Sequence, residues 1–152
     1  MNNPEYVSID GTKYKIKTDY RNALKANEVA QDETITPTER ALAVLFLLFG
    51  EEGINNTDHQ ERLLKSALKY LTCNSEERKT PGNKEPDMDF KQDWQFIVAS
   101  FMSDYGIDIT KEQMHWWTFY SLMCGFTDKC ILSRIREIRN KDLNEIKDPK
   151  NL

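Results

Sequence analysis

Three cysteines and two histidines are the residues of this 152-residue chain best suited to nucleophilic chemistry. A cysteine thiolate becomes an effective nucleophile when a nearby histidine takes up the thiol proton. The one pairing that the sequence offers joins His115 to Cys124 or Cys130. The cysteines form no CxxC pair, and their odd number does not build a full disulfide framework. We therefore expect buried or half-buried thiols, as is usual for free cysteine, and assign no catalytic residue.

Carboxylates gather at Asp87, Asp89 and Asp93, in a pattern that imitates a loop for a divalent metal. These positions lack the glycine and the final glutamate of an EF-hand, so we expect solvated loop carboxylates. Soft ligands are too few for a zinc site to be expected. The sequence contains no GxSxG, Walker-type, GxGxxG or HExxH motif. No metal or cofactor site is therefore predicted.

Charge is unevenly distributed along the chain, which has a net charge of -4. From Lys129 onward seven basic residues face four acidic ones, a net of +3, so the preceding part carries -7. The overall acidity makes nucleic acid an unexpected partner. The basic end is either a surface for an acidic partner or, as we favour, an ordinary solvated helix face. The longest apolar run, 41–49, is too short to cross a membrane, and no signal peptide is visible, so a cytoplasmic protein is expected.

Residues 6–17 alternate between apolar and polar side chains, with Asp10-Gly11 at the centre. This dipeptide favours a type I′ turn, and the alternation predicts a short β-hairpin. The apolar face comprises Val7, Ile9, Tyr14 and Ile16. A lone hairpin is marginal in water, so it should pack on helices or on another chain.

Helical patterns fill residues 18–72, the first helical block. A helix capped by Thr18 or Asp19 should run to about residue 30, with Tyr20, Leu24 and Val29 inward. A capping box at 36–39 opens a second helix, and its run at 41–49, apolar nearly all round, predicts the most buried helix. A third begins at Thr57, which leaves His59 solvated; its apolar stripe comprises Leu63, Leu64, Ala67, Leu68 and Leu71.

Residues 73–89 are rich in charge and contain two prolines, so we expect an exposed loop. The second helical block covers 90–147. Its first helix has an apolar face and ends at Gly106, and a capping box at 110–113 should open the next one. Thr127 or Asp128 should cap the last long helix, whose stripe is Ile131, Leu132, Ile135 and Ile138, and a separate turn follows at 142–146. We predict a mainly α fold, with 1–152 as a single domain of about five to six helices and an N-terminal β-hairpin.

Trp116 and Trp117 are the candidate protein-interaction residues. Adjacent positions on a helix point about 100° apart, so both cannot face one core centrally. One of them should therefore lie at the edge of the core or in a protein–protein contact, where tryptophan is enriched. Stacking on nucleic-acid bases would need a basic groove, whereas the neighbouring residues are acidic or neutral.

Both ends of the chain resemble a family of tail-cluster proteins from long-tailed phages of low-GC Gram-positive bacteria. The similarity rests on VSIDGTKYKIKTDYRNAL near the start and on YGIDIT, MHWW, FYSLMCGF and IREIRNKDLNEIKD later. The middle helices and the loop match only in pattern. The resemblance implies a tail assembly chaperone, which is neither an enzyme nor a cofactor-binding protein. Such a protein would bind the tape measure protein and keep it soluble during tail assembly.

The same resemblance suggests the tail tube protein as a further partner, self-association, and a location in the host cytoplasm rather than in the mature virion. Two other functions stay open. One is a small regulatory or adaptor protein of a mobile element, binding nucleic acid through the basic final helix. The other is a thiol enzyme acting through Cys124 or Cys130.

Replacing each tryptophan singly by alanine should separate their roles. One replacement should unfold the domain, because it removes a core side chain, and the other should spare stability and weaken assembly. Unfolding by circular dichroism and mass by light scattering measure the two effects. Loss of folding in both variants would contradict the assignment of one indole to an interaction surface.

Overall fold

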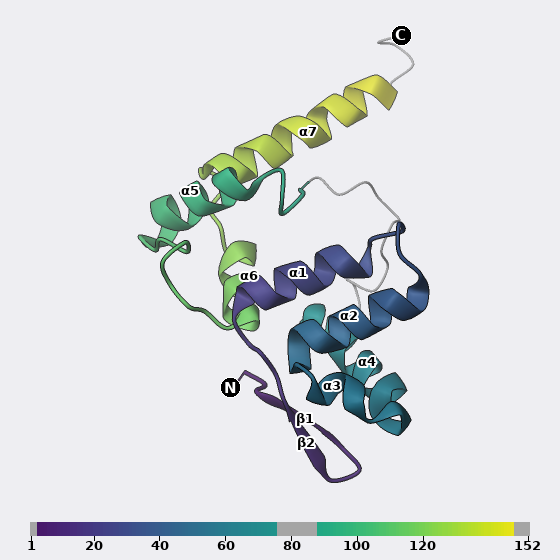
Figure 1. Cartoon of the computed structure of the whole chain (residues 1–152). Coiled ribbons are helices and arrows are strands. Elements are labelled where there is room, and N and C mark those ends of the chain that lie inside the picture. The colour runs from purple at the N-terminus through teal and green to yellow at the C-terminus, as the bar shows by residue number, and fades with distance from the viewer. Residues whose placement is uncertain (1–2, 76–87, 148–152) are drawn as a thin grey trace. The chain divides into compact units, whose positions relative to one another are not determined.

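The computed structural model describes residues 3–75 and 88–147 (Figure 1). Within these ranges lie seven helices and one two-stranded antiparallel sheet, which confirms the mainly α fold with an N-terminal hairpin. The chain divides into two compact units: residues 1–80 with 113–119 form unit 1, and residues 81–112 with 120–152 form unit 2. The single domain expected from the sequence stays a prediction. The elements are β1 (Tyr6–Ile9), β2 (Thr12–Lys15), α1 (Tyr20–Ala30), α2 (Pro37–Phe49), α3 (Glu52–Asn55), α4 (Thr57–Leu71), α5 (Trp94–Tyr105), α6 (Trp116–Cys124) and α7 (Ile131–Lys147).

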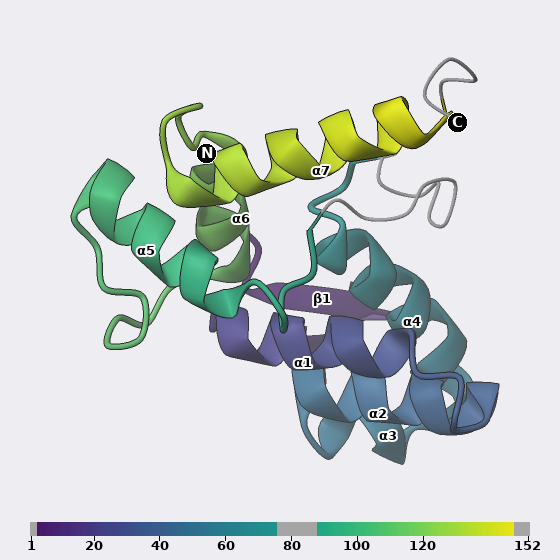
Figure 2. The ribbon, with the colours of Figure 1, turned by 90° about the horizontal axis from the view of Figure 1, so that it is seen from above.

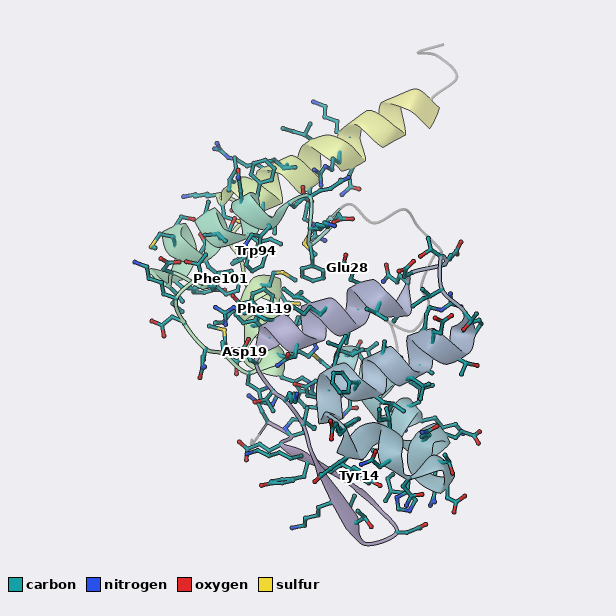
Figure 3. All side chains as sticks on the ribbon, in the orientation of Figure 1. Tyr14, Asp19, Glu28, Trp94, Phe101 and Phe119 are labelled. Atoms are coloured by element: carbon teal, nitrogen blue, oxygen red, sulfur yellow. The ribbon has the colours of Figure 1, made fainter. Side chains whose placement is uncertain are left out.

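The hairpin forms as its sequence predicts. Asp10 and Gly11 both have positive φ, 50° and 81°, as a type I′ turn requires. Tyr14, labelled in Figure 3, is buried on the predicted face. Its hydroxyl lies 2.6 Å from Nδ1 of His59 on α4. His59 is therefore buried, and the solvated histidine expected from the sequence is wrong. Asp10 also accepts two hydrogen bonds from the Arg62 guanidinium, at 2.8 and 2.7 Å, which fasten the turn to α4.

Helices α1 and α2 pack side by side in both views (Figures 1 and 2). Asp19 caps α1 by accepting from the Arg21 backbone N–H at 2.9 Å, as expected. The inward residues of α1 are Tyr20, Ala23 and Ala26, all fully buried. Small side chains on this face let the two helix backbones approach closely. Leu24 and Val29, predicted to face inward, are only half-buried.

Helix α2 begins at the predicted capping box. The Glu39 N–H donates to Thr36 Oγ1 and the Thr36 N–H donates to the Glu39 carboxylate, both at 3.1 Å. The helix ends at Gly50, whose φ is 74°. Its outer side departs from expectation, because Leu42 and Phe46 are 37% and 46% exposed. The run at 41–49 was predicted to be the most buried helix, and that prediction is wrong on this face.

Helices α3 and α4 complete the helical part of unit 1 before the return of residues 113–119. The four-residue α3 was not anticipated from the sequence. Asn56, rather than Thr57, caps α4 by accepting from the Asp58 N–H at 3.0 Å. Leu68 was predicted to belong to the inward stripe of α4, but it is 46% exposed. Of the predicted loop at 73–89, residues 76–87 lie outside the described ranges.

Unit 2 is built on α5 and α7, which lie against each other. Helix α5 ends at Gly106 in the left-handed conformation, with φ 68°, as predicted. The ring of Phe101 lies 5.0 Å from that of Phe126 in the core of this unit. Ser100 of α5 accepts from the Leu132 N–H at 3.1 Å and so caps the first turn of α7. Helix α7 thus starts at Ile131, later than the predicted caps at Thr127 or Asp128, and continues unbroken through the separate turn expected at 142–146.

Replacing Gly53 by alanine should destabilise unit 1. A Cβ at this buried position would lie 2.7 Å from the Leu45 carbonyl oxygen and 2.8 Å from Phe49 Cβ. Overpacking of this kind costs about 1–3 kcal/mol. Urea unfolding followed by circular dichroism measures the loss. Glu52→Ala, at an exposed position of the same short helix, is the matched control; an equal effect of the two changes would contradict close α2–α3 packing.

Candidate protein-interaction site

The segment before the tryptophans is a loop, not the predicted start of a helix. Asp108 accepts from the Thr110 N–H at 3.0 Å and from its hydroxyl at 2.5 Å. The Thr110 side-chain hydrogen bond is the main reason that the pKa of Asp108 lies below its usual range. Residues 109–111 form a turn, and residues 112–115 are not helical. The predicted capping box at 110–113 is wrong, and α6 begins at Trp116.

A short antiparallel bridge places the first residues of α6, 116–119, next to the start of α1 within unit 1. The Tyr20 N–H donates to the Met114 carbonyl and the Trp116 N–H donates to the Thr18 carbonyl, each at 2.8 Å. Asp19 and His115 are the bridge partners. The two helices thus start beside one isolated bridge. The rings of Tyr20 and Phe119 then stack with centroids 4.5 Å apart, and Figure 3 shows Asp19 and Phe119 near the start of α1.

His115 caps the start of α6 with its side chain. Its Nδ1 accepts from the Trp117 N–H at 3.0 Å, and its Nε2 lies 2.7 Å from the Pro4 carbonyl oxygen. A neutral imidazole with the proton on Nε2 satisfies both contacts. Both ring nitrogens are therefore engaged.

The three cysteines, two of which the sequence paired with His115, differ in exposure. Cys130 is buried and Cys73 is half-buried, as expected, whereas Cys124 is exposed. The buried Cys130 thiol lies 3.1 Å from the Ser133 hydroxyl and accepts from the Ser133 N–H at 3.4 Å. Cys130 thus has a local role at the start of α7.

The two tryptophans cap the C-terminus of α4. The Trp116 Nε1–H donates to the Leu71 carbonyl at 3.1 Å, and the Trp117 Nε1–H donates to the Tyr70 carbonyl at 2.9 Å. The last carbonyls of a helix lack partners within the helix, and the Trp116 indole supplies one to the Leu71 carbonyl. The Tyr70 carbonyl also accepts from the Cys73 N–H at 3.0 Å, so Trp117 gives it a second hydrogen bond. A pair of adjacent indoles therefore matches a pair of adjacent carbonyls 45 and 47 residues earlier in the chain.

Burial separates the two indoles. Trp116 is 1% exposed, whereas Trp117 is half-buried and stacks on Tyr70 with centroids 6.2 Å apart. The expected division into one inward side chain and one at the core edge is confirmed. Trp116 is accordingly the residue whose loss should unfold unit 1, and only Trp117 has area for a partner. The assignment of the pair as protein-interaction residues stays a prediction.

Tyr70 carries an unusual buried hydroxyl beneath the tryptophan pair. The residue is 4% exposed, and among the described residues its hydroxyl oxygen has no hydrogen-bond partner. Burial raises the pKa of the Tyr70 hydroxyl well above its usual range, so this side chain is neutral at physiological pH. An unpaired buried hydroxyl costs free energy, and the stacked Trp117 ring offsets part of that cost.

In unit 2 the most prominent polar contact joins Asp93 to Arg139. The guanidinium donates to both Asp93 oxygens at 2.7 and 2.8 Å, and the Asp89 N–H donates to the same carboxylate at 2.9 Å. Asp93 is 1% exposed, so the solvated loop carboxylate expected from the sequence is wrong. The hydrogen bonds from Arg139 are the main cause that lowers the pKa of Asp93.

Other predicted site residues are not brought together. Asp87 lies outside the described ranges, and Asp89 uses one oxygen to accept from the N–H groups of Lys91 and Gln92. Among residues 3–75 and 88–147 no group of three or more His, Cys, Asp or Glu side chains has a metal-binding arrangement. In the same residues no helix is long and apolar enough to cross a membrane.

The outer face of α7 also differs from prediction. Leu132 is buried, but Ile131 and Ile138 are 40% and 58% exposed, although both were assigned to the inward stripe. Of the basic residues in this helix, Arg139 is committed to Asp93, whereas Arg134 and Lys141 are exposed. The exposed face is thus both apolar and basic. Sequence reasoning missed it because the 131/138 spacing fits an inward and an outward stripe equally well.

Asp93→Asn should destabilise the protein at neutral pH and flatten its acid dependence. Removing one member of a buried ion pair costs roughly 3–5 kcal/mol, and less where, as with Arg139 at 38% exposure, one partner meets water. Because the folded pKa is lowered, the contribution is complete above the unfolded value of about 3.9 and is lost as pH falls through the folded value. The difference from the parent chain should therefore shrink below about pH 4. Urea unfolding over a pH series measures it, with Asp128→Asn at an exposed position as control. A gap that persists unchanged to pH 2 would contradict this account.

Comparison with known proteins gives a family assignment. The whole sequence, residues 1–152, matches the family described as Bacteriophage Gp15 protein. Searches among curated proteins and among solved structures gave no match. The family match spans both compact units and includes the bridge, the tryptophan pair and the Asp93–Arg139 contact. The chain therefore belongs to the Bacteriophage Gp15 protein family.

Proposed function

We propose that this protein is a tail assembly chaperone, which binds the tape measure protein of its phage and keeps it soluble until the tail tube forms. Membership of a phage protein family supports this proposal. So does the resemblance of both ends of the sequence to tail-cluster proteins. In this role the protein is not an enzyme, and it acts by binding alone.

The observation that carries the proposal is the exposure of large apolar side chains on a mainly helical scaffold. They occur on both units, and all but one of them lie on helices. Single exposed apolar residues are ordinary, but several at helical spacing provide contacts for amphipathic partner helices. Among the described residues these side chains are Tyr6, Leu42, Phe46, Leu68, Met102, Ile131 and Ile138.

Such contacts suit a holding function. Apolar contacts are not directional, so they tolerate many registers along a long, helical, repetitive partner. They also form and break without ATP, so the tail tube protein can replace the chaperone as it polymerises. We place this activity in the host cytoplasm, before the virion is complete.

Co-expression with the tape measure protein tests the proposal. The soluble fraction of the tape measure protein should rise several-fold when this chain is present, because this chain covers the exposed apolar helices of the tape measure protein. Centrifugation and quantitative gel analysis measure that fraction, with an unrelated acidic helical protein of similar size as control. A tape measure protein that stays insoluble beside an excess of this chain would contradict the chaperone function.

Paired substitutions test whether apolar contacts carry the effect. Tyr6→Ser with Leu68→Ser removes two exposed apolar side chains and should lower the soluble fraction. The matched control, Lys65→Ser with Lys69→Ser, changes exposed polar residues of α4 and should not. If both variants solubilise the tape measure protein equally well, Tyr6 and Leu68 do not belong to the binding surface.

A further inference from the structure

Two exposed rows of side chains have complementary chemistry. We define the α7 row as Ile131, Arg134, Ile138 and Lys141, and the α2 row as Glu39, Leu42 and Phe46. We propose that the α7 row of one copy docks on the α2 row of a second copy, so that copies of this chain join head to tail. This inference does not rest on the proposed chaperone function.

The α7 row follows one outward face of its helix. Its members stand at spacings of three and four residues, the pattern that keeps side chains on one stripe of a helix. All four are exposed, Ile138 most clearly at 58%. The opposite face holds Leu132 and the Arg139 guanidinium, which contact unit 2. The row is therefore apolar and positively charged, and the described part of unit 2 leaves it uncovered.

The α2 row has the same geometry and the opposite charge at one end. Glu39, Leu42 and Phe46 are all exposed and also stand three and four residues apart. One Glu39 oxygen accepts from the Thr36 N–H, and the second oxygen is available to a partner. At the other end Lys17 lies over the Phe46 ring, with Nζ 5.8 Å from its centre. The negative charge of the row is therefore concentrated near Glu39.

These properties favour contact between the two different rows over contact between like rows. Glu39 to Phe46 and Ile131 to Ile138 each span seven residues, about 10 Å along a helix. Pairing α7 with α2 covers apolar side chains on both helices and places Glu39 near Arg134 or Lys141. Pairing α7 with α7 would bring these bases against one another. An antiparallel pair of α2 rows would place Glu39 near Lys17 of the other copy, but it would leave the bases of α7 without an acidic partner. Repulsion of like charges thus disfavours the symmetric α7 pair, and contact between unlike rows gives the bases of α7 an acidic partner.

A contact between unlike rows leaves one free row at each end of every dimer. Further copies can then add, and the product is a ring if the rotation closes and an open chain if it does not. Because part of the attraction is between exposed charges, assembly should weaken as salt rises.

The mass of the full-length protein in solution tests the proposal. Sedimentation and light scattering should show species larger than a monomer, with an average mass that rises with concentration. Ile138→Asp and Phe46→Asp should each yield monomers, because each disables one row. Met102→Asp, at an exposed apolar position of α5, is the matched control and should assemble like the parent chain.

Mixing the two variants gives the sharpest outcome. The Ile138→Asp chain keeps its α2 row and the Phe46→Asp chain keeps its α7 row, so an equimolar mixture should form a one-to-one dimer and nothing larger. Circular dichroism checks that each variant is folded. If either variant is unfolded, Arg134→Glu replaces it in the test. This substitution changes only the charge of the α7 row and should weaken assembly at least tenfold at low salt.

Several results would overturn the proposal. One is a parent chain that is monomeric at every concentration, which includes the case of α7 docking on α2 of its own chain. A second is a mixture of variants that stays monomeric. A third is a variant that still dimerises alone, which would mean a symmetric contact. If the parent is monomeric but both rows are needed to solubilise the tape measure protein, the rows belong to that partner and not to a second copy.

Discussion

Unit 1 depends on the capping of α4 by a segment that returns from far along the chain. Residues 113–119 supply the indole N–H groups for the last carbonyls of α4, the extended pair for Thr18 and Tyr20, and the ring that stacks on Tyr20. The His115 side chain holds the start of α6 and reaches the Pro4 carbonyl, 111 residues away in sequence. These seven residues thus cap a helix, bind the segment before the hairpin and fill part of the core of unit 1. This short segment is a structural requirement of the unit, and its aromatic composition follows from that requirement.

The exposed side chains suggest a different place for interaction. The sequence suggested the adjacent tryptophans as interaction residues. Both of them, however, donate their indole N–H groups to backbone carbonyls within the protein. The side chains that meet water are those of Leu42, Phe46, Ile131 and Ile138, which lie on helices whose other faces are packed. Exposed apolar area lowers solubility, and the high content of charged residues offsets that effect.

Local features were predictable because their partners are close in sequence. The Asp10-Gly11 turn, the Thr36 capping box, the Asp19 cap and the Gly106 terminus each involve contacts over a few residues, and all are found. The failures are of another kind. Asp93 was predicted to be a loop carboxylate because its partner, Arg139, lies 46 residues later in the chain. His59 was predicted to be a surface residue because the contact with Tyr14 is also distant in sequence. The capping box predicted at Thr110 is absent because this segment forms a turn in which Asp108 accepts from the Thr110 N–H and hydroxyl, and the sequence pattern fits either structure. The covered faces of α2 and α7 were predicted wrongly for two reasons. Helix α2 is apolar nearly all round, and the spacing of the isoleucines in α7 fits an inward and an outward stripe.

The return of residues 113–119 also constrains how the protein is made. A ribosome releases the chain from its N-terminus, so the hairpin and the first four helices emerge while the two indoles are still unsynthesised. Until then the Tyr70 and Leu71 carbonyls and the face of Tyr20 have no partner from that segment. Unit 1 therefore completes its fold only after residues 81–112, which belong to unit 2, have also been released. Because unit 2 in turn needs residues after 119, the two units must mature together, and a nascent chain cut short between them leaves neither one finished.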